Sequence, residues 1–273
     1  MEQHDWDYEE FKRWVYRKSG INLSNYKQQQ MQRRINSLMT NSRVTGYREY
    51  SRLLEADSKR YQEFLAKLTI NVTEFFRNPE RFEDLEKTIL PELARSARGG
   101  GGLKAWSAGC SDGAEAYSSA ILLSEMAGSG TSRRHVLATD VDHGVLERAR
   151  NGVYSGAELK NVSEARRGRF FERKGDDAFA VTEKLKQMVQ FKSHDLLLEP
   201  FETGFDLILC RNVVIYFTEE AKDLLYRKFF AALRPGGILL VGGTEPILRY
   251  REYGFEAVLT TFYRRPEAFR DRG

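Results

Sequence analysis

The chain has 273 residues, of which 41% are hydrophobic and 30% are charged. This composition is that of a folded globular protein and excludes a disordered, collagen-like or coiled-coil chain. Only two cysteines occur, and no window approaches 18 uncharged apolar residues. We therefore exclude a disulfide scaffold and direct insertion into a membrane, and we expect a cytoplasmic protein.

The net charge of +4 conceals a strongly basic segment near the N-terminus. Residues 1–10 carry five acidic side chains and no lysine or arginine, whereas residues 11–50 carry nine basic side chains and one acidic side chain. A compact basic segment indicates an acidic partner. The four histidines are scattered and the two cysteines are distant, so no metal-ligand spacing occurs and we expect no metal site.

Apolar residues at helical spacing dominate the first 75 residues, and glycines separate the stretches. The stripes are Tyr8, Phe11 and Val15; Met31, Ile35 and Leu38; and Tyr61, Phe64, Leu65 and Leu68. This pattern predicts an all-helical N-terminal domain of four short helices over residues 1–78. A linker helix and a glycine-rich break follow at 79–102, where four consecutive glycines mark the best candidate boundary.

From residue 103 onward, the pattern becomes an alternation of strands and helices. Short apolar runs predict strands at 103–108, 135–139, 189–192, 205–210 and 238–241, and longer amphipathic stretches predict helices at 114–126, 141–150 and 219–233. Such alternation favours an α/β fold with a parallel, doubly wound sheet over 103–273. Residues 151–190 are polar and fit this alternation poorly, which indicates a small insert at the edge of the sheet.

In an open parallel sheet, ligands bind beyond the carboxyl ends of the strands. The first strand ends in a loop that contains Gly109 and Gly113, and the second ends at Asp140. Glycines let the backbone approach a ligand, and the carboxylate accepts hydrogen bonds from ribose hydroxyls. The loop lacks a diphosphate-binding motif, so the pair suits S-adenosylmethionine. The alternative is a glycine-rich strand–helix turn without a ligand.

Five segments then match one family in order. They are Thr69–Arg77, Trp106–Gly113, Ala138–Asp142, His194–Leu197 and Cys210–Phe217. These segments resemble the motifs of the chemotaxis receptor glutamate O-methyltransferases, and the resemblance covers about residues 8–265. It implies a Rossmann-like S-adenosylmethionine-dependent methyltransferase domain with a small inserted β subdomain, preceded by the helical domain. The insert corresponds to residues 151–190.

The resemblance and the strand ends together predict the site. We expect cofactor contacts from Asn71, Thr73, Arg77, Gly109, Glu115, Asp140, Asp195, Leu196, Asn212 and Val213. Arg77 and Tyr216 are the predicted catalytic residues, which orient the substrate carboxylate, and the product would be S-adenosyl-L-homocysteine. Structural alternatives exist for several of them: Asp195 as a turn residue, Arg77 as an ion-pair partner, Tyr216 as a buried aromatic, and Glu115 as an acid favoured by the helix dipole.

The loop departs from the family pattern at Ala114 and Ala116, where the family has Glu and Pro. Loss of the proline adds backbone freedom at the start of the helix, so a binding module that has lost turnover remains an alternative. A nucleic-acid methyltransferase is a second alternative. Amino methylation of bases commonly uses Pro-Pro after the Asn or Asp of this strand end, whereas Asn212 is followed by Val213.

The basic segment suggests how a substrate docks. Arg33 and Arg34 lie beside the Met31, Ile35 and Leu38 stripe. We expect them to contact the acidic, helical cytoplasmic domain of a transmembrane chemoreceptor, the alternative being a solvated charged face. We expect no nucleic-acid partner, and a monomer is the default state.

Overall fold

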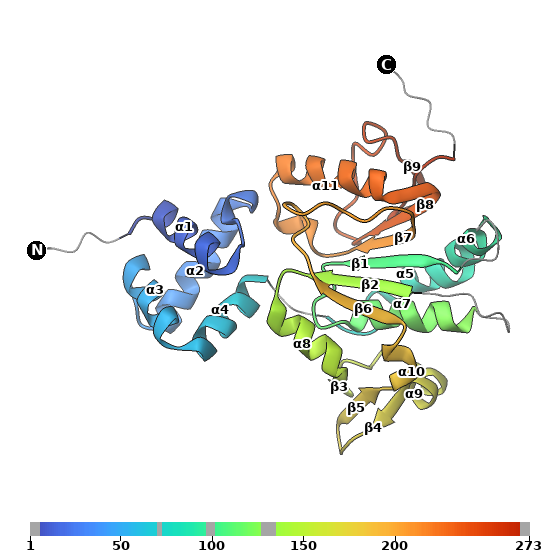
Figure 1. The fold of residues 1–273 in the computed structure, drawn as a ribbon, viewed down its shortest axis with the longest axis horizontal. Helices are drawn as coiled ribbons and strands as arrows, with labels where there is room; N and C mark the ends of the chain where they lie inside the picture. The colour runs from blue at the N-terminus through green and yellow to red at the C-terminus, as the bar shows by residue number, and fades with distance from the viewer. Residues whose placement is uncertain (1–5, 70–72, 97–101, 127–134, 268–273) are drawn as a thin grey trace, which may run out of the picture. The chain divides into compact units, whose positions relative to one another are not determined.

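The computed structural model describes residues 6–69, 73–96, 102–126 and 135–267 (Figure 1). The chain divides into two compact units, each described below by itself. Residues 1–71 and 215–224 form the first unit, and residues 72–214 and 225–273 form the second. The sequence assigned residues up to 78 to the helical domain, and in the structure residues 73–78 belong to the second unit. No helix among the described residues has both the length and the apolar character of a membrane span.

The first unit contains the four helices predicted from the apolar stripes. They are α1 (Tyr8–Ser19), α2 (Gln28–Asn41), α3 (Tyr47–Ala56) and α4 (Ser58–Thr69), with the short 3-10 helix η1 (Leu23–Asn25) after α1. Helix α1 begins with a capping box between Asp7 and Glu10. Its buried Phe11 packs against the rings of Trp14 at 5.4 Å and Phe64 at 6.2 Å between centroids. The predicted stripes thus form the core of this unit.

The first unit also includes a segment from far along the chain. The 3-10 helix η4 (Val214–Tyr216) leads into residues 217 and 218 and then into α11 (Glu219–Ala232). Phe217 forms an isolated β-bridge with Tyr26, and their ring centroids lie 5.0 Å apart. The Thr218 N–H donates to the Asn25 carbonyl at 2.9 Å. Periodicity did not predict this contact, because it joins segments that no local pattern relates.

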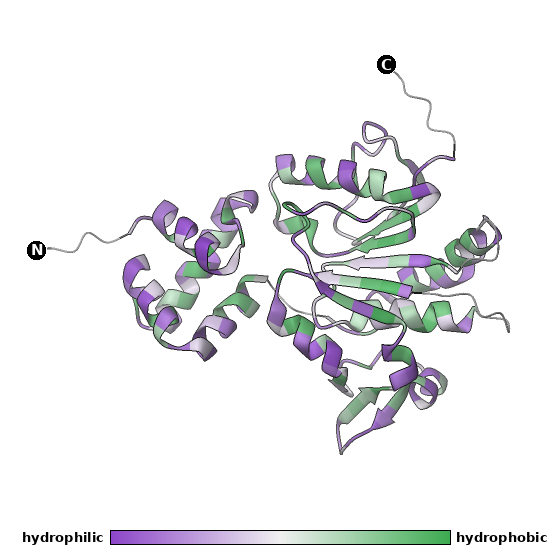
Figure 2. Ribbon diagram, in the orientation of Figure 1, coloured by the Kyte–Doolittle hydropathy of each residue, from purple (hydrophilic) through white to green (hydrophobic). Residues whose placement is uncertain are grey.

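The second unit contains a seven-stranded sheet in the order β6-β2-β1-β7-β8-β10-β9. The strands are β1 (Lys104–Ala108), β2 (His135–Asp140), β6 (Val189–Ser193), β7 (Phe205–Cys210), β8 (Leu233–Val241), β9 (Glu256–Leu259) and β10 (Phe262–Arg264). Strand β7 and the second half of β8 carry mostly hydrophobic residues, as Figure 2 shows. The first five strands are parallel, as predicted.

The sheet also has an antiparallel edge, which the sequence did not predict. Strand β10 runs antiparallel to both β8 and β9. Only residues 260 and 261 separate β9 from β10, so the chain turns back directly and no crossover helix is needed. Both strands are short, which left no recognisable alternation in the sequence.

The predicted linker helix belongs to the second unit. It consists of α5 (Pro79–Asp84), the π-helical turn η2 (Leu85–Ile89) and α6 (Leu90–Ser96), and its apolar face is buried. The glycine-rich break predicted after it lies mostly outside the described residues. Helices α7 (Ala114–Glu125) and α8 (His143–Asn151) follow β1 and β2 as predicted.

Residues 151–190 form the predicted small β subdomain. Its three antiparallel strands have the order β3-β5-β4, and two short helices accompany them. The elements are β3 (Val153–Ser155), α9 (Glu164–Phe170), β4 (Phe171–Arg173), β5 (Ala178–Val181) and α10 (Glu183–Lys186). Arg166 of α9 forms ion pairs with Glu125 of α7 at 2.7 Å and with Glu86 at 2.8 Å, which fastens the subdomain to the rest of the unit.

The segment 73–78 is also fastened to this unit. The Phe75 N–H donates to the Glu158 carbonyl at 3.1 Å, and the Phe76 N–H donates to the Ser118 hydroxyl of α7 at 2.9 Å. The Phe75 ring is fully buried and lies 4.8 Å from the ring of Tyr154. These contacts explain why the second unit begins before the predicted boundary.

We expect the Phe75→Ala substitution to destabilise the second unit by about 3–5 kcal/mol, because it leaves a cavity between the segment and the subdomain. Urea denaturation followed by circular dichroism measures this change. Leu248→Ala is the control, since Leu248 is 87% exposed and its truncation should change stability by less than about 0.5 kcal/mol. Equal stability of the two variants would contradict the packing role of Phe75.

Candidate active site

The carboxyl ends of five adjacent parallel strands meet at one edge of the sheet. After β1, the loop Gly109–Gly113 turns sharply, with positive φ angles at Gly109 (80°), Ser111 (49°) and Gly113 (92°). A Cβ atom on Gly109 would lie 2.5 Å from the side chain of Val213, and one on Gly113 would lie 2.9 Å from that of Ala149. Both glycines are therefore required by close packing as well as by backbone conformation.

Asp140 ends β2 beside this loop. Its Oδ2 accepts the Ser111 N–H at 2.9 Å, and its Oδ1 accepts the Asp142 N–H at 3.0 Å. Burial raises the pKa of this carboxyl from 3.8 to about 6. A carboxylate has about four acceptor positions, so Asp140 keeps acceptor capacity for a ribose hydroxyl beside its backbone donors.

Glu115 lies in the first turn of α7, and its side chain is 13% exposed. Its Oε1 accepts the Ser107 hydroxyl at 2.8 Å, and its Oε2 lies 3.3 Å from an amino group of Arg211. Burial raises the pKa of Glu115, while the charges of Arg211 and Arg77 act in the opposite direction. Glu115 is thus a buried acid with specific partners. An acid placed only by the helix dipole would need neither burial nor these partners.

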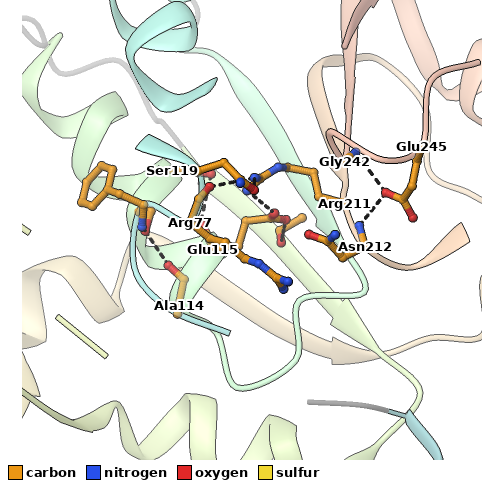
Figure 3. A network of polar contacts seen from close by, with 12 residues as sticks. Arg77, Ala114, Glu115, Ser119, Arg211, Asn212, Gly242 and Glu245 are labelled. Atoms are coloured by element: carbon orange, nitrogen blue, oxygen red, sulfur yellow. Dashed lines mark hydrogen bonds and ion pairs between the residues drawn. The ribbon is translucent and has the colours of Figure 1, made fainter. Parts of the chain in front are cut away.

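Arg211 is the residue of this network that the sequence did not indicate (Figure 3). Its side chain is 2% exposed and donates to the Arg77 carbonyl at 2.7 Å and to Asn78 Oδ1 at 2.8 Å. Positive φ angles at Phe76 (51°) and Asn78 (59°) flank Arg77. The guanidinium therefore holds a sharply bent segment next to Glu115. The sequence could have indicated Arg211 as a site residue, because it directly precedes Asn212 at the end of β7.

Asn212 also has a positive φ of 60°, and it begins the turn whose Val213 side chain covers Gly109. At the end of β6, Asp195 Oδ1 accepts the N–H groups of Leu197 at 2.8 Å and Leu198 at 3.1 Å. These contacts give Asp195 the role of a turn residue, and its contact with a cofactor stays a prediction. The Leu196 carbonyl accepts a hydrogen bond from Lys228 at 2.6 Å.

The structure places most of the predicted site residues in the second unit. Arg77, Gly109, Glu115, Asp140, Asp195, Leu196, Asn212 and Val213 all lie on it, and Thr73 lies half-buried at the start of its described part. Asn71 lies outside the described residues. Tyr216 belongs to the first unit, where the Arg34 guanidinium lies 5.3 Å from the centre of its ring. The predicted role of Tyr216 and Arg77 in orienting the substrate carboxylate therefore stays a prediction.

Two family models match the chain in succession. The all-alpha domain of CheR methyltransferases matches residues 6–69, and the SAM binding domain of CheR methyltransferases matches residues 71–263. The chain belongs to the CheR methyltransferase family. It is therefore an S-adenosylmethionine-dependent methyltransferase, as the sequence predicted.

Individual CheR relatives are similar over nearly the whole chain. A chemotaxis protein methyltransferase of Listeria monocytogenes is 41% identical, with 94% of this chain and 96% of the relative covered. That of Escherichia coli is 34% identical, with 85% and 81% covered. A solved structure of the S-adenosylmethionine-dependent methyltransferase SibL is 21% identical, with 61% of this chain and 37% of that one covered and a TM-score of 0.35.

The CheR site residues fit S-adenosylmethionine. Asp140 offers acceptor capacity for the ribose hydroxyls, and the glycine loop leaves room for a close backbone approach. Glu115 supplies a buried carboxylate suited to the ammonium group of the methionine part. The departures from the family pattern, Ala114 and Ala116, are both buried, and α7 begins regularly at Ala114.

We expect the affinity for S-adenosyl-L-homocysteine to fall as the pH drops through about 6, where Asp140 takes up a proton. Hydroxyl donors favour the ionised carboxylate, so protonation competes with binding and costs up to about tenfold in affinity per pH unit below the pKa. Calorimetric titration between pH 5 and 8 measures the slope, and Asp140→Asn should flatten it.

Asp112 provides the control for this experiment, because burial raises its pKa to about 6 as well. Its carboxylate lies 3.4 Å from Arg148, on α8. The Asp112→Asn variant should keep the slope. A slope that survives in Asp140→Asn and disappears in Asp112→Asn would remove Asp140 from the ribose site.

Proposed function

We propose that this CheR methyltransferase transfers the methyl group of S-adenosylmethionine to glutamate side chains of chemoreceptors. The products are glutamate methyl esters and S-adenosyl-L-homocysteine. The observation that carries the proposal is the match of both domains, in order, to a family whose full-length relatives are named chemotaxis protein methyltransferases. Each methyl ester removes one negative charge, which can bias a two-state receptor bundle.

The reaction requires correct positioning of the substrate carboxylate and does not require a strong base. A glutamate side chain has an ordinary pKa near 4.3 and is already ionised at neutral pH. S-adenosylmethionine supplies an electrophilic methyl group when it is bound. The protein then has to place the incoming carboxylate in line with that group and exclude water.

The site residues divide this work between them. Asp140 binds the ribose, and Glu115 with the Gly109 loop binds the methionine part. Asp195 and Leu196 border the adenine, and Asn212 and Val213 supply contacts nearest the reacting group. Support comes from the common sheet edge and from the buried network that joins Glu115, Arg211 and the Arg77 backbone.

Arg77 orients the substrate carboxylate in this proposal, and Tyr216 assists it. The support for Arg77 is its position between two residues of positive φ, where its charge partly opposes the rise that burial causes in the pKa of Glu115. Asn71 and Thr73 reach the cofactor from the preceding segment. The two roles of Arg77 and Tyr216 rest on the resemblance of their motifs to those of the family.

Receptor docking rests on the two arginines of α2, Arg33 and Arg34. Arg33 is exposed, as docking requires. Arg34 is half-buried, donates to the Leu68 carbonyl at 2.6 Å and stacks on Tyr216, so it also stabilises the first unit. Arg33 is therefore the better residue for contact with the acidic, helical cytoplasmic domain of a chemoreceptor.

The enzyme then works in the cytoplasm, as a monomer, on a membrane-bound substrate. Neither a nucleic-acid methyltransferase nor a binding module without turnover is favoured by the relatives. Incubation with methyl-labelled S-adenosylmethionine and receptor-rich membranes tests the proposal. Base-labile label on protein is expected, label on nucleic acid would contradict it, and cofactor binding without transfer would identify a binding module.

We expect Arg33→Glu to slow receptor methylation severalfold at low salt without changing the affinity for S-adenosyl-L-homocysteine, because it places a negative charge against an acidic helix. Initial rates between 20 and 300 mM salt measure the effect, which should shrink as salt screens the charges. Lys67→Glu on α4 is the control for an exposed charge reversal in the same unit. Equal rates for both variants would exclude docking through Arg33.

A further inference from the structure

Glu245 is a buried acid that the proposed mechanism leaves without a role. It lies beyond β8, its residue is 5% exposed, and its carboxylate faces the turn after β7 (Figure 3). Its Oε2 accepts the Asn212 N–H at 2.6 Å and the Gly242 N–H at 3.0 Å. The Glu245 N–H donates back to the Gly242 carbonyl at 3.0 Å. One carboxylate oxygen thus joins the ends of two neighbouring strands.

Two features of the backbone are explained by this carboxylate: the glycine at position 242 and the left-handed conformation of Asn212. A Cβ atom on Gly242 would lie 2.2 Å from Glu245 Oε2 and 3.0 Å from the Asn212 nitrogen, so only glycine leaves room for the contact. Asn212 adopts a left-handed φ of 60°, a conformation that costs free energy for a residue with a side chain. A charge-assisted hydrogen bond to its N–H is an interaction strong enough to hold it there.

The turn held in this way reaches the glycine loop of the cofactor site. Val213 follows Asn212, and its side chain lies where a Cβ atom on Gly109 would stand, at 2.5 Å. We infer that Glu245 is a positioning residue that fixes Asn212 and Val213 against the Gly109 loop and thereby sets the affinity of the site for the cofactor. The inference rests on the proposed cofactor contacts of Asn212 and Val213.

Asp206, on β7, shows what a carboxylate with a purely structural role does. It is 6% exposed, and it accepts the Lys104 N–H at 2.7 Å and a hydrogen bond from Arg234 at 2.6 Å. It anchors the beginning of β7, at the opposite end from the cofactor site. Asp206 therefore provides a matched control for burial and for hydrogen bonding to the backbone.

The test compares Glu245→Ala with Asp206→Ala by calorimetric titration of S-adenosyl-L-homocysteine, at a temperature where both variants are folded. We expect Glu245→Ala to lose about tenfold or more in affinity, because the Asn212 N–H loses a charged acceptor. Glu245→Gln should restore affinity to within about threefold, since its amide oxygen still accepts the bond. Asp206→Ala should lower the melting temperature and leave the affinity unchanged.

Two further measurements keep the inference testable if Glu245→Ala fails to fold. Gly242→Ala displaces the carboxylate while leaving Glu245 in place, and it should lose affinity to a similar extent. In the cofactor-free protein, amide hydrogen exchange of Asn212 should become faster in Gly242→Ala and in Glu245→Ala. Unchanged affinity and exchange in the folded variants, or an equal loss of affinity in Asp206→Ala, would overturn the positioning role.

The exchange measurement separates this inference from the proposed function. If the wild-type protein does not bind S-adenosyl-L-homocysteine, the proposed function fails. Slower exchange of Asn212 in the wild type than in the variants would still show that Glu245 fixes the turn. If the wild type binds and the variants bind equally well, only the inference fails.

Discussion

A single buried guanidinium, that of Arg211, joins three segments of the site that are far apart in the sequence. It neutralises Glu115 on α7, and it holds the carbonyl of Arg77 and the side chain of Asn78 through hydrogen bonds. Removing one partner of such a buried pair leaves an uncompensated charge, at a cost of about 3–5 kcal/mol. Arg211, directly after β7, therefore adds to the contacts of Phe75 and Phe76 that hold the Arg77 segment.

The end of β7 is fixed from both sides by acids. Glu115 meets Arg211, and Glu245 meets the N–H of the next residue, Asn212. Both carboxylates are buried, so their hydrogen bonds act in a region of low dielectric where they are stronger than in water. This arrangement gives a methyltransferase a rigid strand end against which a flexible cofactor can be bound in one conformation.

Much of the fold followed from local patterns. The helical stripes around Phe11 and Phe64 and the buried run of β7 predicted their elements correctly, because hydrophobic periodicity reflects burial directly. The β9–β10 hairpin was missed, since its strands are too short to show alternation. Residues 73–78, which the sequence assigned to the helical domain, are fastened to the second unit by long-range hydrogen bonds to Glu158 and Ser118.

The site divides in the same way. The sequence by itself determined the family through five motifs that occur in the family's order, and it predicted the glycine loop and Asp140 as cofactor contacts from their places at the ends of two strands. Only the tertiary structure decided that Arg211 and Glu245 support the site. It also decided that Arg34, expected as a docking residue, is half-buried and donates a hydrogen bond within the first unit. A buried ion pair or a hydrogen bond between strand ends depends on which strands become neighbours, and that is set by the packing of the whole sheet.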